Sequence, residues 1–101
     1  MKPETIAIHS GYESESSTKA VAVPIYQTVA YEFDSAQHAE DLFSLATPGN
    51  TYTRLMNPTT DVLEKRVAAL EGGLVALAVS AGSAAINYAI QTIAQQGNNI
   101  V

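Results

Sequence analysis

Residues 74–93 read LVALAVSAGSAAINYAIQTI, and this stretch decides the fold class. Its first six residues are a continuous apolar run of strand length, typical of a strand that is covered on both faces. Small, turn-forming residues follow at 80–83. Apolar side chains then recur with helical spacing as far as 95–96, where Gly97 suits a helix C-cap. The stretch therefore predicts a strand, a tight turn and a helix.

A further helix is predicted directly before this stretch. Asn57 is a good N-cap, and Pro58 suits the first helical position because no N–H is required there. The glycines at 72–73 end the helix. Residues 100–101 open another strand, so the order is helix, strand, helix, strand. This order predicts an α/β domain with a largely parallel sheet.

The first 33 residues do not read as a compact unit. The segment GYESESSTK at 11–19 is polar, small and acidic, which is typical of a mobile loop. The run AVAVPIYQTVAYEF at 20–33 is apolar and β-branched, but Pro24 interrupts it. It is therefore predicted to be an extended arm laid on another surface rather than a central strand. That surface belongs either to a neighbouring subunit or to the chain's own domain, and the sequence leaves both open.

A short amphipathic helix is predicted at about residues 36–46. Asp34 and Ser35 supply side-chain oxygens for the N–H groups of its first turn, and turn residues at 48–50 end it. His38 lies on or near the polar face, where no second histidine or carboxylate has metal-ligand spacing. We interpret it as a solvated histidine rather than a ligand or a base.

Composition excludes several classes of protein. The chain has ten acidic and five basic side chains, for a net charge of −5. No basic cluster is present to neutralise a nucleic-acid backbone. No apolar run approaches the roughly 20 residues that span a bilayer, and the N-terminus lacks the apolar core of a signal peptide. The absence of cysteine excludes disulfides and thiolate metal sites. A soluble, cytoplasmic protein is expected, and the strand-like end at 98–101 indicates a fragment of something larger.

Tyr52 and Arg54 lie in GNTYTRLMNPT at 49–59, with turn residues on both sides. If the segment is extended, side chains two positions apart share a face, so the phenol and the guanidinium project together. A guanidinium matches a phosphate or carboxylate with its planar donors, and a phenol adds a hydrogen bond. The pair is thus a candidate anion clamp. The alternative at this spacing is an exposed arginine beside a half-buried tyrosine, with no ligand.

The junction VSAGSAA at 79–85 is a second candidate for anion binding. A glycine between a buried strand and a helix allows close approach of a ligand, and the helix N-terminus favours an anion. Gly82 and Ser83 are therefore candidates to hold a phosphate through backbone N–H groups, with the Ser83 hydroxyl as an addition. A full GxGxxG and a P-loop Gly-Lys-Ser/Thr are both absent, so a mononucleotide site is not indicated. A tight connection built from small residues for packing is the alternative.

The two candidates together suggest a phosphate clamp for one small cofactor. No nucleophile–base–acid triad can be drawn, since both histidines lie in the N-terminal half and cysteine is absent. No acid pair emerges either. If the chain is part of an enzyme, the chemistry belongs to the cofactor or to residues after position 101.

Four motifs carry a family resemblance: AVPIYQT (22–28), HAEDLF (38–43), GNTYTRLMNPTTDVLEKRVAALEGG (49–73), and ALAVSAGSAA (76–85) followed by GNNIV. They resemble the N-terminal part of the Cys/Met-metabolism family of pyridoxal-phosphate enzymes. That family includes cystathionine synthases and lyases, methionine γ-lyase and O-acetylhomoserine sulfhydrylases. YTRLMNPT with HAEDLF is most similar to the O-acetylhomoserine sulfhydrylases.

The resemblance implies a type I, aminotransferase-like fold, the cofactor pyridoxal 5′-phosphate, and a homotetramer built from tight dimers. It implies that Tyr52 and Arg54 reach across the dimer interface to the phosphate of the neighbour's cofactor. Gly82 and Ser83 would hold the phosphate of the subunit's own cofactor through backbone amides. The Schiff-base lysine, the stacking tyrosine, the aspartate for the pyridine nitrogen and the arginine for the substrate carboxylate are expected after position 101. No catalytic residue is expected within the chain.

The resemblance divides the chain into two parts and implies an activity. Residues 1–57 would be an N-terminal arm with a short helix that makes intersubunit contacts, and residues 58–101 would begin the large cofactor-binding domain. The expected activity is a transferase that makes homocysteine or methionine from O-acetylhomoserine and a sulfur nucleophile by γ-replacement, with the chain inactive alone. The alternatives are a γ-lyase or a cystathionine synthase or lyase of the same family, a non-catalytic subunit-assembly fragment, and a free-standing phosphate-binding domain.

Overall fold

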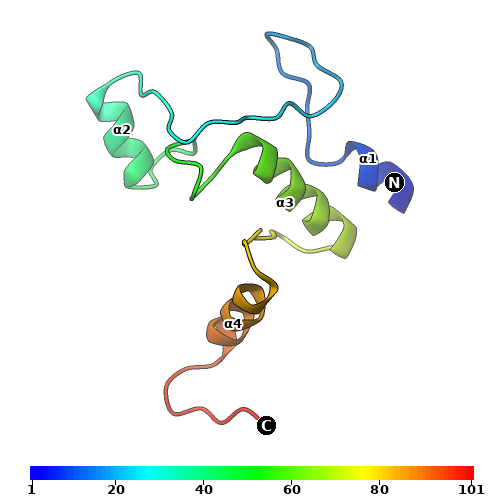
Figure 1. Cartoon of the computed structure of the whole chain (residues 1–101), viewed down its shortest axis with the longest axis vertical. Coiled ribbons are helices and arrows are strands. Elements are labelled where there is room, and N and C mark those ends of the chain that lie inside the picture. Colours follow the sequence, from blue (N-terminus) through cyan, green and yellow to red (C-terminus); the bar gives the residue numbers. More distant parts are fainter.

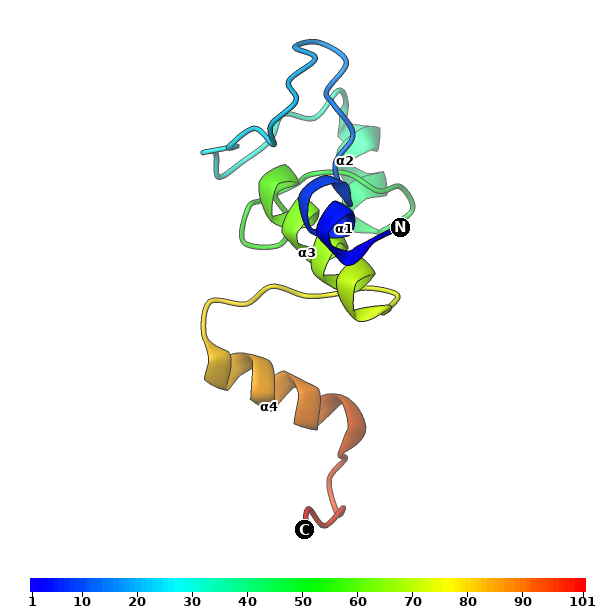
Figure 2. The ribbon, with the colours of Figure 1, turned by 90° about the vertical axis from the view of Figure 1, so that its right-hand side faces the viewer.

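The computed structural model describes all residues from 1 to 101 and contains four helices and no sheet. In chain order the helices are α1 (Pro3–His9), α2 (Ala36–Phe43), α3 (Pro58–Glu71) and α4 (Gly82–Ile93). Only α1 and α3 pack against each other. Figures 1 and 2 show α4 apart from the other helices, beneath α3, at the end of the segment that links the two. None of the helices has the length and apolar content needed to cross a membrane.

Helix α3 begins and ends as the sequence predicts. The Asn57 Oδ1 accepts a hydrogen bond from the Thr59 N–H at 2.9 Å, and Pro58 occupies the first turn. Gly72 follows the helix with φ 67° and ψ 21°, a left-handed conformation that glycine adopts without steric cost. Both predicted caps of this helix are confirmed.

The N-terminus of α2 is also confirmed, because the Ser35 Oγ accepts a hydrogen bond from the His38 N–H at 3.0 Å. The helix ends three residues before the predicted end at residue 46. Leu45 adopts φ 61°, and the Ala46 N–H donates to the carbonyl of Asp41 at 2.9 Å. This is a Schellman motif with leucine at the position that glycine normally fills. Because glycine is absent there, the sequence does not indicate that the helix ends at this point.

Helix α1 has no counterpart in the sequence prediction. Pro3 in its first turn and Glu4 near its N-terminus favour a helix locally. Its position depends on distant contacts, however, since α1 packs on α3 and the Arg66 Nε donates to the carbonyl of Ser10 at 2.9 Å. Contacts across more than fifty residues leave no local signal in the sequence.

The predicted strand at 74–79 is not formed, and neither is the predicted parallel sheet. No backbone hydrogen bond joins this segment to another, and the Ala78 N–H instead donates to the Glu64 carboxylate at 2.8 Å. A strand requires a neighbouring strand to accept its hydrogen bonds, and the segment beside this one is helix α3. The sole β-type pairing is an antiparallel bridge between Ala30 and Tyr52.

Helix α4 ends at Ile93, short of the predicted 95–96. Ala94 is already extended, and the Gln95 N–H donates to the Asn98 Oδ1 at 2.6 Å. An asparagine side chain that captures a backbone N–H competes with continuation of a helix. Gly97 is left-handed at φ 94°, but it lies in the turn that follows rather than at the cap.

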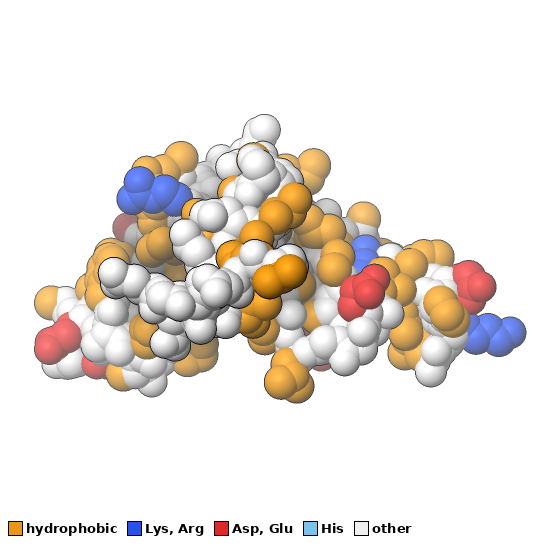
Figure 3. Space-filling model, turned by 90° about the horizontal axis from the view of Figure 1, so that it is seen from below, with side chains coloured by type: hydrophobic (Ala, Val, Ile, Leu, Met, Phe, Trp, Pro, Cys, Tyr) orange, Lys and Arg blue, Asp and Glu red, His pale blue; other side chains and the backbone are white.

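The chain buries very few side chains. Five residues are buried: the apolar Leu42, Val62 and Ala68, and the polar Thr51 and Asn57. Figure 3 shows hydrophobic side chains spread over the visible surface. The most exposed stretch lies in the predicted strand and in α4, where the apolar side chains include Leu74, Val75, Leu77, Ile86 and Ile93. Polar contacts, rather than an apolar core, therefore hold the segments together.

The arm at 20–33 lies on α3 of its own chain. The Thr59 Oγ1 donates to the carbonyl of Pro24 at 2.8 Å and accepts from the Tyr26 N–H at 2.9 Å. The Asn57 Nδ2 donates to the carbonyl of Tyr26 at 2.9 Å. The sequence leaves open whether the arm lies on a neighbouring subunit or on its own chain. Residues 24–26 lie on their own chain.

The loop at 11–19 is closed by tyrosine hydroxyls. The Tyr12 hydroxyl donates to the carbonyl of Ala20 at 2.8 Å, and the Tyr26 hydroxyl donates to Glu15 Oε1 at 3.0 Å. The hydrogen bond from Tyr26, followed by one from Thr18, lowers the pKa of the Glu15 carboxyl below its ordinary value. The same bond raises the pKa of the Tyr26 phenol. The loop is thereby fastened to the arm.

We expect Gly72→Ala to lower the free energy of unfolding by about 1 kcal/mol, because a Cβ is strained in the left-handed conformation. A Cβ at Gly72 meets no atom within 4 Å, so the cost is backbone strain alone. Urea denaturation of the protein expressed from its complete reading frame measures it. Gly73→Ala is the matched control, since Gly73 lacks a positive φ and its Cβ makes ordinary contacts at 3.7 Å and 3.9 Å. Equal effects of the two variants would contradict the assignment of the cap to Gly72.

We expect Tyr26→Phe to return the pKa of the Glu15 carboxyl toward its ordinary value, because it removes the main cause of the lowering. A carboxyl with a lowered folded-state pKa stabilises the fold above its unfolded-state pKa, and this is lost as pH falls through the folded value. The difference in the free energy of unfolding between the parent and Tyr26→Phe should therefore become smaller at acid pH. Carbon-13 NMR titration of Glu15 tests the shift. Thr18→Val is the control and should give a smaller rise; an unchanged titration in Tyr26→Phe would refute the account.

Candidate functional site

The segment that carries Tyr52 and Arg54 is a turn rather than an extended strand. The carbonyl of Tyr52 accepts hydrogen bonds from the N–H groups of Leu55 at 2.9 Å and Met56 at 3.0 Å. Tyr52 itself pairs with Ala30 in the antiparallel bridge, so the chain is extended up to this residue and turns after it. The condition that the segment is extended therefore holds only up to Tyr52.

The phenol and the guanidinium nevertheless lie together. The guanidinium carbon of Arg54 lies 5.3 Å from the centre of the Tyr52 ring, within the range of a cation–π contact. The two ion pairs of the chain are Lys65 with Asp61 and His38 with Asp34, so Arg54 pairs with no carboxylate. The Tyr52 side chain is exposed, and its hydroxyl donates to no acceptor in the chain. The turn thus presents a cation and a phenol to solvent with their hydrogen-bonding capacity free.

The N-terminus of α4 presents a second set of donors. Ala81 is the N-cap, and its methyl side chain offers no acceptor for the first turn. The carbonyl of Ala81 takes the N–H groups of Ala84 and Ala85, which leaves the N–H groups of Gly82 and Ser83 without a protein acceptor. A Cβ at Gly82 would meet nothing within 4 Å, so the approach to these donors is open. Uncapped N–H groups at the positive end of a helix dipole suit a phosphate.

The two sets of donors are separate within the chain. No hydrogen bond or ion pair joins the turn at 52–55 to the start of α4. In Figure 1 the turn lies by the N-terminal end of α3, whereas α4 begins below that helix. The structure therefore does not bring the four candidate residues into one clamp. The Arg54 guanidinium and the uncapped N–H groups of the α4 start are donors, which fits an anion such as the phosphate of pyridoxal phosphate.

His38 belongs to the start of α2 rather than to a site. Its Nδ1 accepts a hydrogen bond from the Asp34 N–H at 3.1 Å, and its ring meets the Phe33 ring edge-on at 6.4 Å. No group of three or more histidine, cysteine or carboxylate side chains in the chain could hold a metal ion. His38 thus takes part in the local structure of the helix N-terminus.

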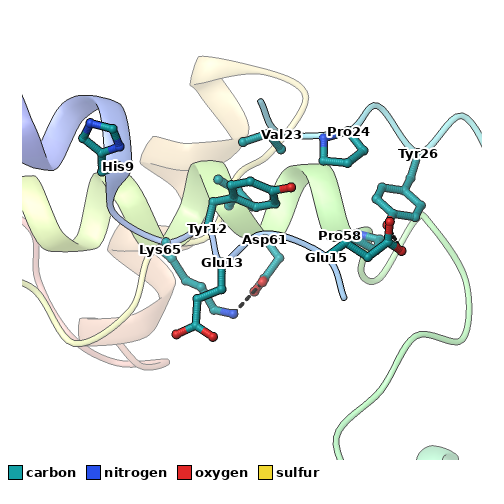
Figure 4. Close-up of a pocket in the computed structure, with 12 residues that line it drawn as sticks. His9, Tyr12, Glu13, Glu15, Val23, Pro24, Tyr26, Pro58, Asp61 and Lys65 are labelled. Carbon is teal, nitrogen blue, oxygen red and sulfur yellow. Dashed lines mark hydrogen bonds and ion pairs between the residues drawn. The ribbon is translucent and has the colours of Figure 1, made fainter. Parts of the chain in front are cut away.

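The main pocket of the chain lies elsewhere, with a volume of about 710 Å³ between α1, the loop at 11–15, the arm and α3. Figure 4 shows Tyr12 and Tyr26 along it, with Glu15 pointing to Tyr26 and Lys65 paired with Asp61 at 2.6 Å. The sequence prediction misses this pocket, because its walls come from segments far apart in the chain. It includes none of the four candidate residues.

Comparisons with known proteins identify the family. The model of the Cys/Met metabolism PLP-dependent enzyme family matches residues 4–101. The chain is 57% identical over 100 residues to an O-acetyl-L-homoserine sulfhydrylase of Leptospira meyeri, covering 99% of this chain and 23% of that protein. It is 49% identical over 100 residues to the homocysteine/cysteine synthase of Saccharomyces cerevisiae, covering 97% of this chain and 22% of the relative. The chain thus spans about a quarter of the length of these relatives.

Two solved structures share the fold of this region. A putative O-acetylhomoserine (thiol)-lyase from Campylobacter jejuni, which carries a pyridoxyl-lysine phosphate, matches with a TM-score of 0.89 and 41% identity over 97% of this chain and 24% of that one. The metB protein of Corynebacterium glutamicum matches with a TM-score of 0.82 and 32% identity over the same shares of the two chains. Both are enzymes of the type I fold. Because the family model matches residues 4–101, the chain belongs to the Cys/Met metabolism PLP-dependent enzymes.

Proposed function

We propose that this chain supplies two phosphate-binding elements of an enzyme that replaces the acetate of O-acetylhomoserine with a sulfur nucleophile, giving homocysteine or methionine. The reaction is taken from the names of relatives that are 57% and 55% identical to the chain. The observation that carries the role of the chain is its pair of surfaces with free hydrogen-bond donors: Arg54 with Tyr52, and the uncapped start of α4. Both suit the phosphate of pyridoxal phosphate, which when bound supplies an electron sink to the reaction.

The start of α4 would bind the phosphate of the subunit's own cofactor. The N–H groups of Gly82 and Ser83 are directed donors whose positions the helix fixes, so binding a phosphate there requires little ordering. The backbone supplies these donors whatever the side chain at position 83. The Ser83 hydroxyl would add a hydrogen bond, but the backbone carries the interaction.

Tyr52 and Arg54 would bind the phosphate in the neighbouring subunit. Support comes from the separation of the turn from α4 within one chain, which leaves the pair without a phosphate of its own (Figure 1). Arginine provides a bidentate fork for phosphate oxygens, and the Tyr52 ring lies against the guanidinium in a cation–π contact. A subunit alone would thus hold half of each phosphate site.

The exposed apolar surface fits the same assembly. Val21 and Ile25 of the arm are 92% and 80% exposed, and residues 1–57 as a unit would pack them against the neighbour in a tight dimer, two of which form the tetramer. Residues 58–101 would begin the large cofactor-binding domain. There the unpaired backbone at 74–79 would join a mostly parallel sheet, and α4 would cover one face of it.

We expect Arg54→Ala to weaken the binding of pyridoxal phosphate by roughly ten- to a hundredfold, the range for loss of a hydrogen bond to a charged group. The protein expressed from its complete reading frame is freed of cofactor, and its dissociation constant is then measured by equilibrium dialysis. Pyridoxal, which lacks the phosphate, should bind the variant and the parent alike.

Lys2→Ala is the matched control, because it removes one exposed positive charge far from the turn. It should leave the affinity for both ligands unchanged. If Arg54→Ala retains the parent affinity for pyridoxal phosphate, or loses affinity for pyridoxal to the same extent, Arg54 does not bind the phosphate.

A further inference from the structure

The direction in which Tyr52 and Arg54 project is not set by their own contacts. Both side chains are exposed, neither tip has a partner apart from the other, and the carbonyl of Tyr52 closes the turn that carries them. A flexible guanidinium on an unanchored turn would bind a phosphate more weakly, because binding would have to order the side chain. Something else in the chain must therefore fix the backbone between the two residues.

Thr53, the residue between them, is held on the opposite side of the turn. Its N–H donates to the carbonyl of Val29 at 2.8 Å. Its hydroxyl donates to the carbonyl of Thr28 in a short hydrogen bond and accepts from the Asn57 Nδ2 at 3.2 Å. One residue thus makes three hydrogen bonds, two of them to the arm and one to the cap of α3.

Asn57 connects this anchor to the rest of the chain. It is 5% exposed, and its amide is fully used: the Oδ1 accepts from the Thr59 N–H, and the Nδ2 donates to the Tyr26 carbonyl and to the Thr53 hydroxyl. The buried amide cannot shift without leaving a polar group unpaired, which is costly. Asn57 therefore fixes the position of the Thr53 hydroxyl relative to helix α3.

We propose that the Thr53 hydroxyl, held by Asn57 and by the arm, is the positioning group that aims Tyr52 and Arg54 at the phosphate. The inference rests on the proposed function and adds to it a residue that does not touch the ligand. Adjacent residues of an anchored turn have fixed directions, so three hydrogen bonds on Thr53 preorganise its two neighbours. Without the hydroxyl, the turn keeps Tyr52, Arg54 and its charge, but the orientation of these two side chains is no longer fixed.

The test compares Thr53→Val with Thr53→Ser in the protein from its complete reading frame. Valine has the shape of threonine without the hydroxyl, whereas serine keeps the hydroxyl. We expect Thr53→Val to weaken pyridoxal phosphate roughly three- to tenfold, the equivalent of one ordinary hydrogen bond, and Thr53→Ser to restore the parent affinity. Affinity for pyridoxal should not change in either variant, which a general loss of structure would not permit.

A double-mutant cycle with Arg54→Ala separates the inference from the proposed function. In the Arg54→Ala background, Thr53→Val should weaken binding less than it does in the parent, since only the Tyr52 phenol remains to be positioned. If Arg54→Ala alone has no effect, the proposed function fails and the inference fails with it. If Arg54→Ala weakens binding but Thr53→Val matches the parent, or weakens pyridoxal equally, the inference alone is overturned.

Asn57→Asp is the second variant. An aspartate keeps the α3 cap but has no N–H to donate, which removes the bond to the Tyr26 carbonyl. The Thr53 hydroxyl can then bond to position 57 only as a donor, at the expense of its bond to the Thr28 carbonyl. It should weaken pyridoxal phosphate more than pyridoxal. Ser35→Ala, which removes the cap of α2 far from the turn, controls for loss of one capping bond and should weaken neither. Equal behaviour of the two variants would overturn the inference.

Discussion

The fold of this chain depends on one buried amide. Asn57 caps α3 through its oxygen and holds the arm and the 52–55 turn through its nitrogen, so three segments meet at one side chain. Three apolar residues are buried in the whole chain, too few to fix the segments by packing. Because a buried amide must satisfy all of its hydrogen-bonding groups, the arm and the turn take one arrangement relative to the helix.

Sequence reasoning succeeds where the cause is local. The caps Asn57 and Gly72 are set by the residues that supply them, and both are predicted. It fails where the partner is distant: α1 packs on α3, and the strand at 74–79 has no partner in the chain. The candidate site shows both cases. Tyr52 and Arg54 lie together as predicted, but a turn and a cation–π contact bring them together instead of strand alternation.

The separation of the two candidate anion-binding surfaces within one chain is central to the proposed function. A cation with a phenol on a turn and an uncapped helix start each offer a phosphate part of what it needs. In one chain they face different surroundings, and the arm beside the turn exposes apolar side chains such as Val21 and Ile25. Under the proposed function, a second subunit would cover the arm and bring its own phosphate to the turn. Cofactor binding and assembly would then be one event.

Mixed oligomers test this claim most directly. Arg54→Ala removes the donor to the neighbour's phosphate; Gly82→Pro removes an N–H from the subunit's own site, and proline suits both the first helical position and the extended Ala81 before it. Subunits of each variant are co-purified with two different tags, and cofactor binding is titrated. The account predicts weak binding by either variant alone, but sites of parent affinity in the mixture, at most one for every two subunits. A mixture with no site of parent affinity would contradict it.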